Sequence, residues 1–223
     1  MTFSPKLNIL PASQRALWKE LKATPKHFVL YGGTALALRL GHRVSEDFDF
    51  FTNATFEPQD LAGHILYLRD GKVTLLRENT LTVVVDRNGP VSVSFFGGLG
   101  ITRVSSPDTA DDNGVQVASL LDVEGCKMAV VQRRAEGKDY RDIAALLENG
   151  ISLPKALAAA KAIYGDQFES TTTLRALSYF ADGNLPKLPA SMQNALRTVA
   201  IGVKLNELPV LIGKHDLASQ GKD

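Results

Sequence analysis

The spacing of apolar and polar positions changes near residue 119. Before that point, short runs such as His27–Tyr31 and Val91–Phe96 are apolar or alternate at every second residue, which is typical of strands. From Ser119 onward, apolar residues recur at helical spacing and glycines separate the segments. The pattern therefore predicts an α/β (α+β) protein, with a mixed sheet flanked by helices over residues 1–118 and a helical region over residues 119–213.

Turn and cap residues place the individual elements. A first helix is predicted at Ser13–Ala23, a second begins at Thr34 as its N-cap, and a third opens at Pro58. Asp86–Gly89 has strong turn chemistry and predicts a hairpin of the strands on either side. The other predictions are strands at 27–31, 47–51, 73–76, 81–85, 91–96 and 115–118, a polar loop at 105–114, helices after Ser119 and at 140–147, 153–163, 171–180 and 189–203, and a disordered tail at 214–223.

Composition restricts the classes of protein without selecting one. In 223 residues, 25 Lys and Arg nearly balance 24 Asp and Glu, so overall charge favours neither a nucleic-acid nor a membrane partner. The single Cys126 excludes an intramolecular disulfide and a cysteine-rich zinc site. No apolar segment approaches the about 20 residues that span a bilayer, and the first residues lack the pattern of a signal peptide. We therefore expect a cytoplasmic protein.

Two glycines and two acidic residues carry the first chemical signal. Gly32 and Gly33 follow a predicted strand, where they allow a tight turn and let an anion approach backbone N–H groups at the start of a helix. Asp47 and Asp49 are two positions apart on another predicted strand, so their side chains project toward the same side. Such a pair repels itself unless a divalent cation lies between the two, and hard oxygen ligands suit Mg²⁺ or Mn²⁺. Together these features predict a site for a nucleoside triphosphate and a metal ion.

Each part of this pattern also has a purely structural interpretation. A Gly-Gly turn or an Asp-x-Asp pair alone is commonly an ordinary turn or a solvated strand edge. A second charged cluster has the same ambiguity, since Lys127 and Arg134 share one predicted helix face and Asp139 and Asp142 lie three apart on the next helix. Charge-rich helix junctions are commonly solvated surfaces with weak ion pairs.

The order and spacing of these motifs resemble one known family. The segment from Gly32-Gly33-Thr34 through Arg39 to Asp47-Phe48-Asp49 is similar to the first motif of the AbiEii/AbiGii family, nucleotidyltransferase-like toxins of the DNA polymerase β superfamily. Lys127 to Arg134 looks like the second motif of that family, and Lys138 to Ile143 looks like its third, Lys-Asp-x-x-Asp. The resemblance covers roughly residues 28–147 and implies a nucleotidyltransferase-fold core whose active site the helical region completes.

The resemblance also implies roles for particular residues. The implied nucleotide-binding residues are Gly32, Gly33, Thr34, Arg43, Ser45, Lys127 and Arg134. The implied catalytic residues are Asp47, Asp49, Lys127 and Asp142, with Asp47 and Asp49 as metal ligands and with Lys138 and Asp139 in support.

One departure concerns a third carboxylate. Polymerase β-type transferases usually carry a third metal-binding acid on a later strand, and the matching strand here, Val91–Phe95, offers Ser92 and Ser94 instead. Asp142 is a substitute that the family's third motif suggests. Without a substitute, the site would bind nucleotide and metal but transfer poorly.

Two functions follow from these considerations. The first is a metal-dependent nucleotidyltransferase that moves a nucleotidyl group from an NTP to RNA, such as a tRNA end, or to protein, and that acts as the toxin of a toxin–antitoxin or abortive-infection system with a cognate antitoxin. The alternative is a non-catalytic module that binds nucleotide or a partner and retains the fold. The sequence does not indicate the base used, the acceptor or the oligomeric state.

Overall fold

The chain folds into two units. The computed structural model describes residues 1–218. The first unit comprises residues 1–101 and 106–119 with the described residues from His215 on, and the second comprises residues 102–105 and 120–214. The sequence predicts boundaries at residues 118 and 213. In the structure residues 102–105 group with the helices, and the described residues from His215 on group with the sheet.

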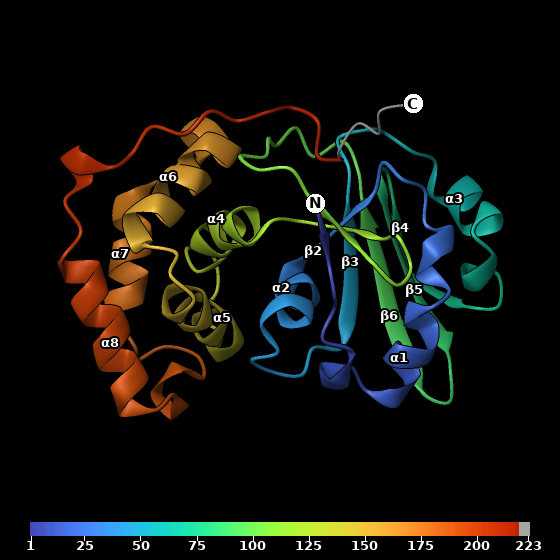
Figure 1. Ribbon diagram of the computed structural model, residues 1–223, viewed down its shortest axis with the longest axis horizontal. Coiled ribbons are helices and arrows are strands. Elements are labelled where there is room, and N and C mark those ends of the chain that lie inside the picture. The colour runs from blue at the N-terminus through green and yellow to red at the C-terminus, as the bar shows by residue number, and fades with distance from the viewer. Residues whose placement is uncertain (219–223) are drawn as a thin grey trace. The chain divides into compact units, whose positions relative to one another are not determined.

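An eight-stranded mixed sheet forms the first unit, in the order β1-β7-β8-β2-β3-β6-β5-β4 (Figure 1). Its strands are β1 (Thr2–Phe3), β2 (Val29–Tyr31), β3 (Asp47–Phe51), β4 (Lys72–Arg77), β5 (Thr80–Asp86), β6 (Pro90–Phe96), β7 (Asp108–Ala110) and β8 (Gln116–Val117). Its helices are α1 (Ala12–Trp18), α2 (Gly32–Leu40) and α3 (Pro58–His64), with 3₁₀ turns at Leu7–Ile9, Leu21–Ala23 and Leu66–Leu68. All six predicted strands and the predicted hairpin of β5 and β6 are confirmed.

Alternation along β3 divides its side chains between the core and the open face of the sheet. Phe48 and Phe50 are fully buried, where the Phe48 ring stacks with Trp18 of α1 and the Phe50 ring stacks with Phe95 of β6. Burying aromatic rings on one face fixes the register of a strand, because a slip by one residue would place them in solvent. The burial of the phenylalanines therefore holds the carboxylates between them on the other face.

The loop predicted at 105–114 is wrong in part, because it contains β7. That strand pairs in parallel with β1 and antiparallel with β8. Arg39 of α2 fixes the strand further, since its guanidinium donates to the Asp108 carboxylate at 2.8 Å and lies over the Phe3 ring. A three-residue strand that pairs with two-residue strands is too short to give a periodic signal of its own.

The helix predicted at Ser13–Ala23 is also wrong in part, because α1 ends at Trp18. Asn113 Nδ2 donates to the Trp18 carbonyl oxygen at 2.8 Å, which occupies an acceptor that the next helical turn would use. The chain then forms the short 3₁₀ turn at Leu21–Ala23. The predicted helix that opens at Pro58 ends at His64, and a 3₁₀ turn follows it.

The tail predicted to be disordered from residue 214 is ordered as far as the structure describes it. Lys214 exchanges two backbone hydrogen bonds with Arg103, and Asn53 Nδ2 donates to the His215 carbonyl oxygen. Leu217 is buried. The rest of the predicted tail, residues 219–223, lies outside the described residues.

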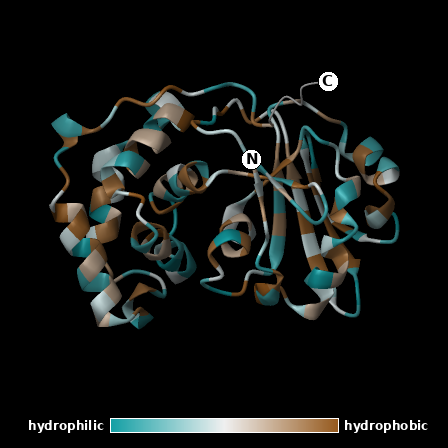
Figure 2. Ribbon diagram, in the orientation of Figure 1, coloured by the Kyte–Doolittle hydropathy of each residue, from teal (hydrophilic) through white to brown (hydrophobic). Residues whose placement is uncertain are grey.

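Five helices form the second unit: α4 (Leu120–Val130), α5 (Gly137–Glu148), α6 (Leu153–Tyr164), α7 (Ser170–Ser178) and α8 (Ala190–Ile201). Figure 2 shows hydrophilic and hydrophobic residues on each of them, as amphipathic helices around a core require. Asp122 on α4 accepts hydrogen bonds from the backbone N–H groups of Val104 and Ser105, which ties that segment to the helices. None of the helices within the described residues combines the length and apolar character that a membrane crossing needs.

Glu124 on α4 is a buried acid that the sequence pattern did not single out. Its side chain is fully buried, and neither carboxylate oxygen has a hydrogen-bond partner within the described residues. Burial raises the pKa of Glu124 to about 9, against a smaller opposing effect of the Lys155 charge. The folded state therefore holds Glu124 as a neutral acid at neutral pH.

Replacing Glu124 should make the protein more stable in a pH-dependent way. Between the ordinary pKa of 4.5 and about 9, the folded state retains a proton that the unfolded state releases, so the free energy of unfolding falls as pH rises. We expect Glu124→Gln to remove this loss and to raise the free energy of unfolding by on the order of 3 kcal/mol at pH 8, with little change near pH 4.5. Urea denaturation of both proteins at several pH values measures the difference, and a pH-independent difference would contradict the buried neutral acid.

Candidate active site

Asp47 and Asp49 project from the same face of β3, as the sequence predicts. Asp47 is exposed and Asp49 is half-buried, whereas the phenylalanines that alternate with them are buried. In the antiparallel pairing of β2 with β3, Asp49 lies opposite Tyr31, the residue that precedes the Gly-Gly turn. The sheet itself therefore brings the acidic pair to the turn.

The side chains of Asp49 and Arg43 lie against the two glycines of the turn. Gly32 has a φ of +75°, which favours glycine, and a Cβ on it would lie 2.9 Å from Asp49 Oδ2. A Cβ on Gly33 would lie 2.3 Å from a terminal nitrogen of Arg43. Side chains at these two positions would displace groups of opposite charge, so the glycines allow a carboxylate and a cation to lie against the backbone at the start of α2.

Thr34 is not the N-cap of α2, contrary to the prediction. The helix begins at Gly32, which makes Thr34 its third residue. The buried Thr34 hydroxyl instead bonds to Ser45 Oγ at 2.8 Å and to the Asp47 carbonyl oxygen. This tie holds the start of α2 to the start of β3, while contact of Thr34 or Ser45 with a nucleotide stays a prediction.

A serine occupies the strand position beside the acidic pair. β6 runs parallel to β3, with Ser92 in register with Asp47 and Ser94 in register with Asp49. On the far side, β5 places Thr82 in register with Ser94, and the Thr82 hydroxyl donates to Ser94 Oγ at 3.2 Å. The register thus places hydroxyl side chains, and no acid, next to the acidic pair on its β6 side.

The donor set fits a divalent cation in part. Two carboxylates on one strand face supply hard oxygen ligands of the kind that Mg²⁺ and Mn²⁺ prefer. Within residues 1–218, no group of three or more His, Cys, Asp or Glu side chains is placed to hold a metal ion. A cation here would complete its coordination with phosphate oxygens and water, which is how Mg²⁺ is commonly bound.

The second and third motifs form a buried ion cluster in the second unit. Lys127 Nζ on α4 lies 2.7 Å from Asp139 Oδ1 and 2.6 Å from Asp142 Oδ2, both on α5. Arg134 Nε donates to Asp139 Oδ2 at 2.8 Å. The two aspartates are fully buried and the Lys127 side chain is 7% exposed. The structural interpretation of a solvated charged surface is therefore wrong for Lys127, Asp139 and Asp142, whereas the Arg134 side chain is 44% exposed at the edge of the cluster.

Electrostatics within this cluster favour the charged forms. Burial alone would raise the pKa of Asp139, but hydrogen bonds and charge from Arg134 and Lys127 outweigh it and hold that pKa below its usual range. Two cations and two carboxylates give the cluster no net charge. Lys138 lies outside it, on the surface, where its ammonium pairs with Glu136 at 3.1 Å.

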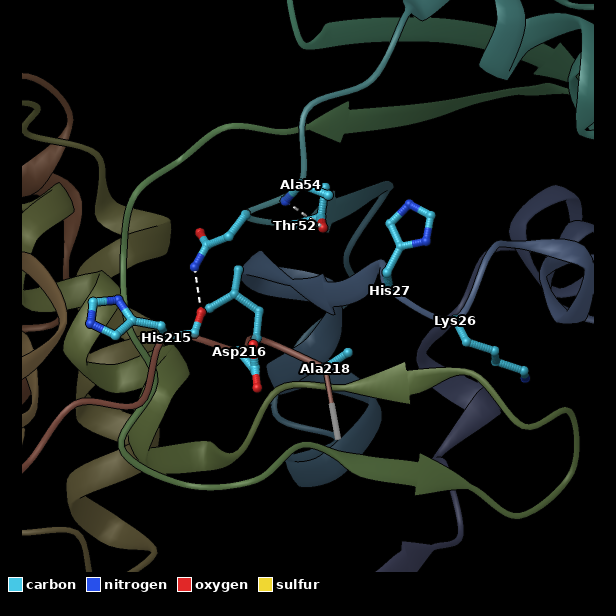
Figure 3. Close-up of a pocket in the computed structure, with 9 residues that line it drawn as sticks. Lys26, His27, Thr52, Ala54, His215, Asp216 and Ala218 are labelled. Carbon is cyan, nitrogen blue, oxygen red and sulfur yellow. Dashed lines mark hydrogen bonds between the residues drawn. The ribbon is translucent and has the colours of Figure 1, made fainter. Parts of the chain in front are cut away.

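A separate pocket of about 350 Å³ lies at the opposite end of β2 and β3 (Figure 3). Lys26 and His27, which line it, precede β2, whereas the Gly-Gly turn follows that strand. Thr52 and Asn53 follow β3, and the chain from His215 closes one side. No residue singled out by the motifs lines this pocket.

Comparison with known proteins agrees with the fold and the motifs. The chain is 19% identical to a candidate nucleotidyltransferase from H. pylori, with a TM-score of 0.56 over 88% of this chain and 94% of that one. It is 16% identical to MenT4, the nucleotidyltransferase toxin Rv2826c from Mycobacterium tuberculosis H37Rv, with a TM-score of 0.58 over 87% of this chain and 83% of that one. An uncharacterised protein of Aquifex aeolicus (strain VF5) is 29% identical over 158 residues, 70% of this chain and 74% of the relative.

The fold is that of the nucleotidyltransferases. Residues 15–205 match the family model described as nucleotidyl transferase AbiEii toxin, type IV toxin–antitoxin system, and the chain belongs to that family.

Removing the central cation of the buried cluster should destabilise the second unit strongly. We expect Lys127→Met to lower the free energy of unfolding by about 3 kcal/mol or more, because it leaves two buried carboxylates short of a counter-ion. Lys204→Met is the matched control: its ion pair with Glu207 is exposed, so a change below about 0.5 kcal/mol is expected. Denaturant unfolding compares the two variants, and equal effects would show that the buried pairing contributes little.

Proposed function

We propose that the protein transfers a nucleotidyl group from a nucleoside triphosphate to an acceptor, with release of pyrophosphate. The observation that carries the proposal is the pair of carboxylates beside the glycine turn, with the Asp49 carboxylate against Gly32 and the Arg43 guanidinium against Gly33. Membership of the AbiEii family supports the same activity and supports the role of a toxin with a cognate antitoxin.

Each part of the first unit has a task in this reaction. Asp47 and Asp49 would hold Mg²⁺ or Mn²⁺, which when bound neutralises charge that develops on phosphate oxygens. The N–H groups at the start of α2 and the Arg43 guanidinium offer positive charge to a triphosphate. The Thr34 hydroxyl donates to the backbone carbonyl oxygen of Asp47. This bond fixes the start of β3, so the acids are positioned before any ligand binds.

The second and third family motifs support roles for Lys127 and Asp142 in the same reaction. In the proposal Lys127 neutralises phosphate charge and Asp142 completes the catalytic set, while Arg134 and Asp139 hold them in place. Their buried ion pairs restrict the side chains to one arrangement, which favours preorganised charge.

For the acceptor we propose RNA, with a tRNA end as the first candidate. The support is local basicity: Arg133 and Arg141 are exposed on the second unit and could contact a phosphate backbone. Arg134 and Lys138 lie between these two arginines in the sequence, and each pairs with an acidic neighbour. A protein acceptor is the other candidate.

A non-catalytic nucleotide-binding or partner-binding module is the second function to consider. The serine in register with Asp49 favours it, because a third strand carboxylate is what transferases of this superfamily usually carry.

Neutralising both acids should abolish transfer while the fold persists. We expect Asp47→Asn with Asp49→Asn to reduce transfer by a factor of about 1,000 or more, since a bound cation contributes several kcal/mol of charge stabilisation. The assay incubates the protein with each labelled triphosphate, Mg²⁺ or Mn²⁺, and total RNA or cell protein, with circular dichroism to verify folding.

Three results of that assay separate the hypotheses. Transfer by the natural sequence alone supports the enzyme, equal transfer by the double variant contradicts the assigned acids, and triphosphate binding without product favours the non-catalytic module. Induced expression of each protein in a bacterial host tests the toxin role, which requires that the natural sequence, and not the double variant, slows growth.

The glycine turn provides a second, independent prediction. Gly32→Ala should lower the free energy of unfolding by about 1–2 kcal/mol through its positive φ, and should weaken binding of a Mn²⁺–triphosphate complex about tenfold by displacing Asp49. Gly100→Ala is the control, because Gly100 also has a positive φ but no neighbour that a Cβ would meet. Calorimetric titration of both variants should show weaker binding for Gly32→Ala alone. Equal affinities would contradict the role of the glycine turn in binding the triphosphate.

A further inference from the structure

The open face of the sheet carries a row of three side chains across β3, β6 and β5. Asp49, Ser94 and Thr82 are in register with one another on neighbouring strands, so their side chains project from the same face. Neighbouring strands lie about 4.8 Å apart, which makes Ser94 the side chain next to the Asp49 carboxylate on its β6 side.

The Ser94 hydroxyl is held rather than free to rotate. Ser94 is 7% exposed, and its oxygen accepts a hydrogen bond from the Thr82 hydroxyl at 3.2 Å. An accepted bond on the β5 side leaves the Ser94 proton for an oxygen on the other side. The row thus presents a neutral donor beside Asp49, at the position where an acid would present a negative charge.

The protein supplies few carboxylate ligands for two divalent cations. Asp47 and Asp49 contribute two negative charges, and the Arg43 guanidinium against Gly33 contributes a positive one. No third acid joins the pair to make a metal-binding group among the residues that the structure describes. Two divalent cations about 4 Å apart repel each other, and two carboxylates leave the triphosphate as the main source of anionic ligands for a second cation.

We propose that this site takes one divalent cation per bound nucleotide, because position 94 carries a neutral side chain in place of an acid. The inference rests on the proposed function, since it assumes that Asp47 and Asp49 bind a cation with a triphosphate. An aspartate at the same position would add the charge that a second cation needs.

The experiment counts cations per bound nucleotide. Each protein is dialysed against Mn²⁺ and a non-hydrolysable triphosphate, and the retained Mn²⁺ and nucleotide are measured by elemental analysis and absorbance. Electron paramagnetic resonance provides a second readout, because two Mn²⁺ ions in one site broaden each other's signal. The chains compared are the natural sequence, Ser94→Asp, Ser94→Ala and the control Thr80→Asp, which adds the same charge on β5 opposite Phe96 instead of beside an acid.

The proposal expects a ratio of one for the natural sequence, Ser94→Ala and Thr80→Asp, and a ratio of two for Ser94→Asp. A ratio of two in the natural sequence or in Ser94→Ala would overturn it, as would a ratio of one in a folded Ser94→Asp. If Ser94→Asp does not fold, the natural sequence and Ser94→Ala still decide between one cation and two. Retention of neither Mn²⁺ nor nucleotide by the natural sequence would instead contradict the proposed function itself.

Discussion

The pairing of β2 with β3 is the constraint on which the first unit's site depends. It sets the glycine turn at the end of one strand against the acidic pair at the start of the other, so that Asp49 lies opposite Tyr31. Burial of Phe48 and Phe50 prevents the strand from slipping by a residue, because a slip would expose both rings and turn the acids into the core. The positions of the carboxylates are thus a consequence of hydrophobic packing on the opposite face of the sheet.

The second unit places its charged motifs by a different principle. Lys127, Asp139 and Asp142 compensate one another inside a helical core, where separate charges would be costly to bury, and the partly exposed Arg134 pairs with Asp139 from its edge. Such a cluster stabilises one arrangement of α4 and α5. Glu124, one turn earlier on α4, has no such compensation and is held as a neutral acid.

Elements with a clear hydrophobic periodicity could be predicted from the sequence of this protein, whereas contacts between residues far apart in the sequence could not. Alternation predicts β3 and β6, turn residues predict the β5–β6 hairpin, and helical spacing predicts α4 to α8. The strand β7 has only three residues and a partner more than a hundred positions away, so no local pattern reveals it. The end of α1 depends on the hydrogen bond from Asn113 to Trp18, and the role of the Thr34 hydroxyl depends on its bond to Ser45. Both are tertiary contacts, which local sequence patterns do not indicate.

The same distinction applies to the candidate site. The spacing of Asp47 and Asp49 indicates their common face, and the two glycines indicate a close approach to backbone, because both follow from local geometry. The burial of Asp139 and Asp142, and the register of Ser94 with Asp49, depend on which elements meet in space. Sequence spacing alone could therefore name the acids but could not distinguish a solvated charge cluster from a buried one.

The proposed function requires that Asp47 and Asp49 hold a divalent cation beside the glycine turn. Crystals of the protein soaked with Mn²⁺ and a non-hydrolysable triphosphate, measured at a wavelength where manganese scatters anomalously, locate the ion directly. The account predicts an anomalous peak about 2.1–2.3 Å from a carboxylate oxygen of each aspartate, with the triphosphate against Gly32 and Gly33. A peak elsewhere, or a triphosphate bound away from this turn, would contradict it.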